Sequence, residues 1–233
     1  MFRRFLPLLG ALVFAIYCNA QQLLSPSFTF SHNKTAYVTL NDGTELKGTL
    51  KDIDRKKGLI KFVNLEDGTG KKHKLKPETI KYMYLPPSGV DKLSKAASFL
   101  TDMQKWNNEK MDQDLLNQGY VYFENTKVKI KKKEFTLLMQ LLNPSFSRVV
   151  KVYHDPLAKS TASIGAGPVT LAGGDAKSYY IKIGEDAAFL VEKKNYKKEF
   201  VPLWKSCANV KEKYPEVKWT QLADHIITYT ECK

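Results

Sequence analysis

Side chains suited to acid–base or nucleophilic catalysis are few and scattered in this sequence. Its four histidines are isolated from one another along the chain: His32, His73, His154 and His225. His154 stands beside Asp155, so the two could form an acid–base pair, but neighbours at the end of a strand point apart. The motifs H-E-x-x-H, G-x-S-x-G and G-x-G-x-x-G do not occur. The sequence therefore predicts no catalytic residue, no metal and no cofactor.

Lysines concentrate in one candidate strand. Lys127, Lys129 and Lys131 alternate with Val128 and Ile130, and a period of two places the lysines on one face of a strand. The whole chain has 37 Lys and Arg against 24 Asp and Glu, a net charge of +13. The lysine face has two interpretations. It is either an anion-binding surface or a solvated, charged edge that blocks aggregation.

The first 20 residues predict a signal peptide. Two arginines precede an apolar run over residues 5–17, which is too short to span a bilayer comfortably, and small residues suit cleavage after Ala20. An uncleaved membrane anchor and a lipoprotein attached through Cys18 are the alternatives. The mature chain contains no other stretch long and apolar enough for a transmembrane segment. We therefore expect an exported protein, either periplasmic or extracellular.

Two cysteines near the C-terminus predict a disulfide. Cys207 and Cys232 are the only cysteines of the expected mature chain, and an even pair outside the reducing cytosol is usually bridged. Two free thiols are the alternative. Each cysteine follows a predicted helix, one over 196–204 and one over 219–229. The bridge therefore requires these two helices to run close to parallel.

The stretch 34–86 predicts five short β-strands. Alternating apolar residues recur between turn signals, of which Asn41-Asp42-Gly43 is the clearest, and Gly48 permits a bend or bulge. Five strands in so short a stretch favour a small closed or nearly closed barrel, because closure removes the sheet edges. The order V-x-L-x-D-G, then G-x-L, then a short turn resembles Sm-like and SH3-like barrels. The resemblance implies the fold and not the ligand.

Two further parts follow the predicted barrel. A helical connector is expected over 88–118, where apolar residues recur at helical spacing and a second helical piece ends before Gly119. Residues 119–233 predict a module in which an antiparallel sheet is covered by the C-terminal helices. The expected fold class is therefore α+β, consisting of the SH3/Sm-like barrel, the helical connector and this module.

The whole mature chain resembles a functionally uncharacterised family of secreted bacterial envelope proteins. The similarity rests on four segments: 38–43, 85–89, 137–156 and 193–207. It implies export and this architecture, and it implies no reaction. We expect an exported, non-enzymatic protein with a binding or structural role at the cell envelope. Its expected partner is an envelope protein or an anionic polymer, since export disfavours nucleic acid. The alternative is an envelope-polymer hydrolase with a site assembled from distant residues.

Overall fold

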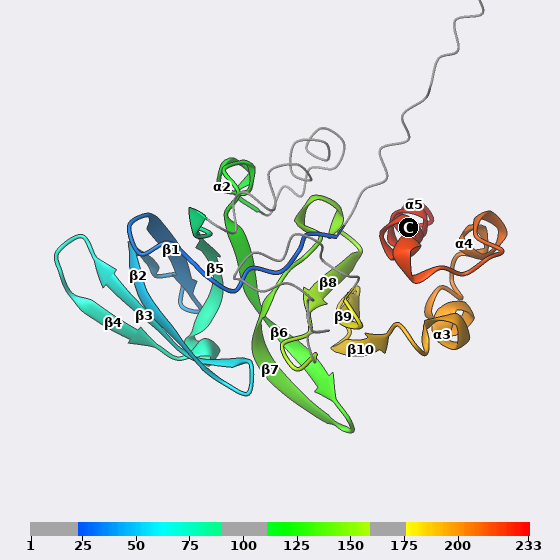
Figure 1. Ribbon diagram of the computed structural model, residues 1–233, viewed down its shortest axis with the longest axis horizontal. Helices are drawn as coiled ribbons and strands as arrows, with labels where there is room; N and C mark the ends of the chain where they lie inside the picture. The colour runs from blue at the N-terminus through cyan, green and yellow to red at the C-terminus, as the bar shows by residue number, and fades with distance from the viewer. Residues whose placement is uncertain (1–22, 90–110, 159–175) are drawn as a thin grey trace, which may run out of the picture.

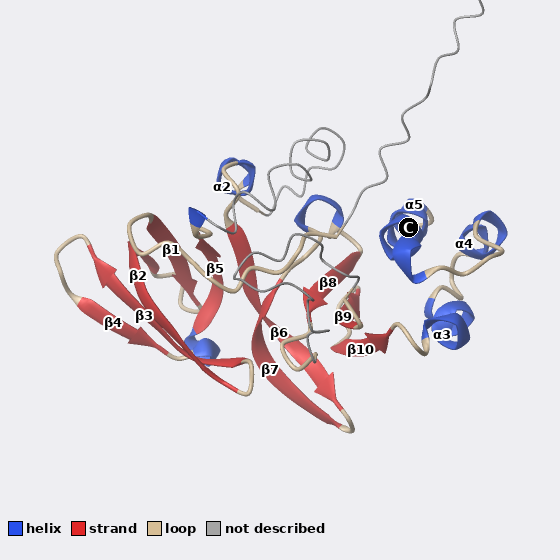
Figure 2. Cartoon of the chain, in the orientation of Figure 1, coloured by secondary structure: helices blue, strands red, loops and turns tan. Residues whose placement is uncertain are grey.

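Ten β-strands of the described residues form one mixed sheet (Figures 1 and 2). The structure is a computed structural model that describes residues 23–89, 111–158 and 176–233. The strands follow one another in the order β4-β3-β2-β1-β5-β6-β10-β9-β8, and β7 pairs with β6 off this path. Their bounds are β1 (Thr35–Leu40), β2 (Glu45–Lys56), β3 (Leu59–Asp67), β4 (Lys72–Leu75), β5 (Ile80–Leu85), β6 (Val121–Ile130), β7 (Lys133–Gln140), β8 (Val150–His154), β9 (Ser178–Ile183) and β10 (Ala188–Glu192).

Tight turns join the first five strands where the sequence predicts them. Lys57 and Gly58 have φ angles of 52° and 81°, as the two central residues of a type I′ hairpin turn require. Asp67 organises the turn between β3 and β4, because its Oδ1 accepts a hydrogen bond from the Lys71 N–H and its Oδ2 lies 2.7 Å from His73 Nε2. The single 3₁₀ turn η1 (Pro77–Thr79) then leads directly into β5.

The predicted five-stranded barrel is wrong, because the sheet does not close around β1–β5. β4 lies at one end of the sheet, whereas β5 pairs with β1 on one side and with β6 on the other. The reason lies in the two faces of β5. Met83 and Leu85 join one core, while Tyr82 and Tyr84 pack on the other face against Tyr122 of β6. A strand with two apolar faces is more stable inside a large sheet than in a small barrel.

β6 is the centre of the second half of the sheet. It pairs with β7 along one side, and its other side carries β5 at its start and β10 near its end. β10 runs parallel to β6, so the prediction of a purely antiparallel sheet is wrong at this pair. The β8-β9-β10 hairpins fix the direction of β10 before it reaches β6. Just after β7, Leu141 forms an isolated bridge with Tyr153 of β8.

The predicted helical connector between two separate modules is wrong, because β5 pairs directly with β6 in one continuous sheet. Of its expected span, residues 90–110 lie outside the described residues. The short helix α2 (Gln113–Asn117) is capped by Asp112, whose carboxylate accepts a hydrogen bond from the Leu115 N–H at 3.0 Å. The helix ends before Gly119, as predicted, and Gly119 has a φ of 84°. Leu115 packs with the tyrosines of β5 and β6.

The C-terminal helices cover one face of β8, β9 and β10, as predicted (Figure 1). They are α3 (Tyr196–Leu203), α4 (Ala208–Lys213), the 3₁₀ turn η3 (Trp219–Gln221) and α5 (Leu222–Glu231). Phe200, Trp204 and Ile226 from these helices form one buried cluster with Val152 of β8 and Ile181 of β9. The helices lie together at the β8–β10 end of the molecule, away from β1–β4.

The predicted disulfide between Cys207 and Cys232 is present, with a Cα–Cα distance of 5.9 Å. Contacts between α3 and α5 advance along both helices in the same order. At the start of α3, the Tyr196 hydroxyl lies 2.7 Å from Nδ1 of His225 in α5. At the end of α3, the Trp204 ring packs on Tyr229, which lies further along α5. The two helices therefore run in the same direction, as the bridge requires.

Residues 1–20 and the predicted cleavage after Ala20 lie outside the described residues, so the signal peptide stays a prediction. Most of the Gly-rich segment over 157–176 also lies outside them. Among the described residues, no helix has both the length and the apolar character needed to cross a membrane.

Candidate anion-binding surface

The lysine face predicted from the sequence lies near the turn of the β6–β7 hairpin. Lys127, Lys129 and Lys131 are exposed, whereas Val128 between them is fully buried. The alternation reflects the two faces of β6, because successive side chains of a strand point to opposite faces of the sheet. Val128 lies in a buried cluster with Ala188 of β10 and Met139 of β7. β6 is hydrogen-bonded on both sides at Val128 and Lys129, so Lys129 is displayed on a well-supported backbone. Lys131 lies beyond the end of β6, so it is not on the strand face that the sequence predicts.

The turn of the same hairpin adds two more exposed lysines. Lys131 and Lys132 form the turn between Ile130 and Lys133. Lys131 has a φ of 58°, an uncommon value for a residue other than glycine. The turn is the lowest point of the ribbon in Figure 1, away from the C-terminal helices. We call the five lysines of this region the basic hairpin tip: Lys127, Lys129, Lys131, Lys132 and Lys133.

The charges of the basic hairpin tip are not neutralised by neighbouring acids. Elsewhere acids do pair with lysines, as Glu124 does with Lys151, but no ion pair within the described ranges involves any lysine of the tip. Segment 127–134 contains one acid, Glu134 opposite Lys129, and carries a net charge of +4. Lysines two residues apart on a strand are about 7 Å apart, within the Debye length of about 8 Å. Their potentials therefore add.

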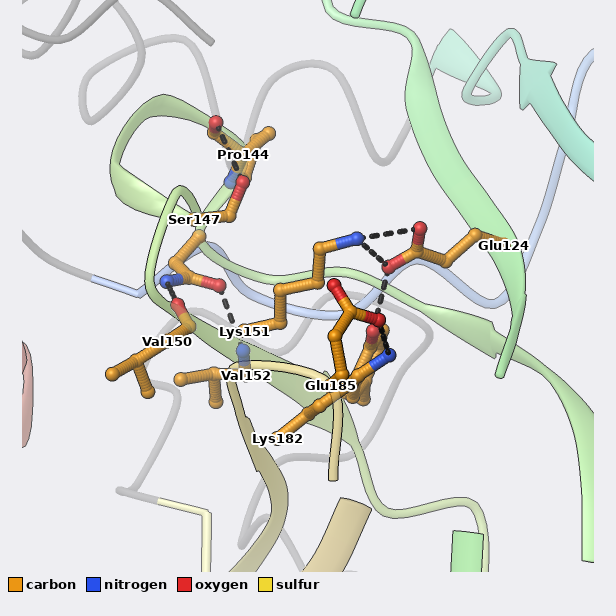
Figure 3. Close-up of polar contacts among 10 residues, drawn as sticks. Glu124, Pro144, Ser147, Val150, Lys151, Val152, Lys182 and Glu185 are labelled. Atoms are coloured by element: carbon orange, nitrogen blue, oxygen red, sulfur yellow. Dashed lines mark hydrogen bonds and ion pairs between the residues drawn. The ribbon is translucent and has the colours of Figure 1, made fainter. Parts of the chain in front are cut away.

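A second polar cluster, which the sequence analysis missed, lies within the curved sheet (Figure 3). Glu124 of β6 accepts hydrogen bonds from Lys151 Nζ at 2.7 and 2.8 Å and from the Tyr153 hydroxyl at 2.6 Å. Burial and the Glu124 carboxylate raise the pKa of Tyr153, so its phenol stays protonated and donates. Lys182, opposite Lys151 on β9, lies 3.8 Å from Glu185. Because these charges are paired, we interpret the cluster as a structural contact between β6 and β8.

His154 and Asp155 are engaged in separate contacts. The Asp155 carboxylate accepts hydrogen bonds from the Ser178 hydroxyl at 2.7 Å and from the Leu157 N–H at 2.9 Å. The His154 ring packs edge-on against Phe28, and burial lowers the pKa of His154 to about 4. The imidazole is therefore neutral at pH 7. These contacts fit a structural role, and the hydrolase alternative gains no support from this pair.

Two further features of the described ranges bear on metal and ligand binding. These ranges contain no group of three or more His, Cys, Asp or Glu side chains placed to bind a metal ion. A small depression beside the start of β6 is lined mainly by apolar groups, among them Leu24, Tyr120, Tyr122 and Leu141. Its lining includes no His, Asp, Glu or Lys. The basic hairpin tip is therefore the candidate site that the geometry supports best.

Comparisons with protein-family models, with curated proteins and with solved structures found no match to this chain. The resemblance to secreted bacterial envelope proteins therefore stays a prediction.

Proposed function

We propose that this chain is an exported, non-enzymatic protein that binds an anionic component of the cell envelope through the basic hairpin tip. The observation that carries the proposal is the group of five exposed lysines on a β-hairpin, none of which pairs with an acid of the described residues. A cluster of like charges raises the local concentration of anions and accelerates their association.

The number of lysines is sufficient for measurable binding. A lysine next to an anionic membrane surface contributes about 1 kcal/mol, so Lys127, Lys129 and Lys131 together contribute about 3 kcal/mol. That free energy corresponds to roughly a 100-fold change in affinity. The contribution is screened by salt, so binding should weaken steeply as the ionic strength rises.

The disulfide supports export. Bridges such as Cys207–Cys232 form and persist in oxidising compartments and are rare in the cytosol. Fractionation of cells that express the full-length chain tests this part of the proposal, together with the mass of the recovered protein. A mass that begins at Gln21 would agree with cleavage after Ala20. Retention of the uncleaved chain in the cytosol would contradict it.

Binding is tested with two anionic probes, long-chain polyphosphate and vesicles that contain phosphatidylglycerol. The test variant replaces Lys127, Lys129 and Lys131 by Gln. The matched control replaces three exposed lysines of the C-terminal region by Gln and so removes the same charge: Lys198, Lys205 and Lys211. We expect the test variant to lose about 100-fold in affinity for both probes, and the control to stay close to wild type. Equal losses in the two variants would reduce the effect to net charge and overturn the proposed site.

A further inference from the structure

The face of the hairpin opposite the lysine row carries exposed apolar side chains. Phe135 of β7 is 44 % exposed, and Leu190 of β10 is 40 % exposed. Ile130 of β6 is half-buried. Large apolar side chains so exposed are few in the described part of this chain, and two of them lie beside the basic hairpin tip.

The strand register places these side chains on one face. Phe135 pairs with Val128, and Val128 pairs with Ala188, so the three share a face across β7, β6 and β10. Leu190 follows Ala188 by two residues and therefore points the same way. Continuing the parallel register by two residues brings Leu190 opposite Ile130. Phe135, Ile130 and Leu190 thus form an apolar patch over three adjacent strands.

Three lysines border this patch at the end of the hairpin. Lys133 pairs with Ile130 and so lies on the apolar face, and Lys131 and Lys132 form the turn beyond it. Lys127 and Lys129 project from the other face of β6. The end of the hairpin is therefore amphipathic, with an apolar centre and cationic groups around and behind it. A lysine stem can lie along apolar surface while its ammonium group stays in a polar layer.

We propose that the end of the β6–β7 hairpin docks on an anionic lipid bilayer, with Phe135 and Leu190 entering the interface and the lysines contacting headgroup phosphates. This inference rests on the proposed function and names its partner. A soluble polyanion would satisfy the lysines but would leave the apolar patch in water. A bilayer interface accommodates both, because aromatic and aliphatic groups enter the acyl boundary while Lys side chains reach the phosphates.

The test compares two double variants for binding to vesicles and to polyphosphate. Phe135→Thr with Leu190→Thr removes the apolar patch and keeps residues that suit strands. Val201→Thr with Leu157→Thr is the control, because these side chains are also exposed, at 54 % and 44 %. All variants keep the same N-terminus, so any contribution of residues 1–22 is common to them. We expect the patch variant to lose at least tenfold in affinity for phosphatidylglycerol vesicles and to bind polyphosphate as wild type does.

A fluorescence measurement tests insertion directly. Phe135→Trp adds one indole at the patch, and Val201→Trp adds one on α3 as the control. With phosphatidylglycerol vesicles that carry brominated acyl chains, the added emission at residue 135 should shift to the blue and be quenched. The added emission at residue 201 should change in neither respect.

The outcomes separate this inference from the proposed function. Loss of vesicle binding in the patch variant, with quenching at residue 135, supports the bilayer. If the patch variant binds vesicles as wild type does and residue 135 is not quenched, the inference is overturned while lysine-dependent anion binding stands. If the lysine variant keeps full affinity for both probes, the proposed function falls, and this inference falls with it.

Discussion

Lys151 of β8 donates to both carboxylate oxygens of Glu124 on β6, with Nζ–O distances of 2.7 and 2.8 Å (Figure 3). The two strands are not neighbours in the sheet order, since β10 and β9 lie between them. The Lys151 side chain is 27 % exposed and the Glu124 side chain is 14 % exposed. The pair therefore joins distant strands across a curved sheet, in a partly dehydrated environment.

Replacing Lys151 by Met is expected to lower the free energy of unfolding by about 2 kcal/mol, because it leaves Glu124 without a cation. The partial exposure of the pair keeps this value below that of a fully buried one. Adding Glu124→Gln should recover part of the loss, since a neutral amide still accepts from Tyr153. Urea unfolding measures both variants. A Lys151→Met protein as stable as wild type would contradict a structural role for the pair.

Gly58→Ala is expected to destabilise the protein by about 2 to 3 kcal/mol. About 1 kcal/mol comes from placing a side chain at a φ of 81°, and the rest from overpacking, because an added Cβ would collide with the Pro156 carbonyl oxygen. Gly43→Ala is the matched control. It has a φ of 87° and nothing within 4 Å of an added Cβ, so only the backbone cost is expected. Equal losses on urea unfolding would contradict the packing of the β2–β3 turn on Pro156.

Cys232→Ser is expected to lower the free energy of unfolding by about 3 kcal/mol, the value for a closed loop of this length. The bridge joins residues 25 apart and holds the end of α5 beside the start of α4. Secretion should be unaffected. Non-reducing mass spectrometry of the wild-type protein provides the direct check. A mass with two free thiols would refute the bridge.

The free energy of unfolding should fall as the pH is lowered from about 6.5 to about 4. Burial lowers the pKa of both His154 and His225 to about 4, whereas the unfolded chain binds these protons near pH 6.5. The contribution of these two neutral histidines to the free energy of unfolding is therefore fully present above pH 6.5 and is lost as the pH approaches 4. Between these pH values, the slope of the free energy of unfolding against pH is about 2.7 kcal/mol per pH unit for two such groups and about 1.4 kcal/mol per pH unit for one.

His225→Phe is the variant that tests this titration. The His225 ring is fully buried among Tyr196, Phe200 and Tyr214, so another aromatic ring suits the site. The variant should show about half the wild-type slope. Burial raises the pKa of Asp224, which opposes the trend at the acidic end, but this group is common to both proteins. Parallel pH profiles of the two proteins would show that His225 contributes nothing.

The sequence by itself determined the local elements and the lysine row. The alternation of Lys127, Val128 and Lys129 predicts one exposed and one buried face, because successive side chains of a strand point to opposite faces. The turn at Asn41-Asp42-Gly43, where Gly43 has a φ of 87°, also follows from residue type. The Cys207–Cys232 bridge follows from the number of cysteines in the expected mature chain.

Only the tertiary structure decided which strands are neighbours. The pairing of β5 with β6, the parallel approach of β10 and the contact between Glu124 and Lys151 all join residues that are distant in sequence. Periodicity shows that a strand has a buried face but does not name the partner that buries it. Tyr82 and Tyr84 alternate with Met83, so they lie on the opposite face of β5 from Met83. Tyr84 is buried and Tyr82 is half-buried, because both pack against Tyr122 of β6 and Tyr84 also packs in one cluster with Leu115 and Leu116 of α2.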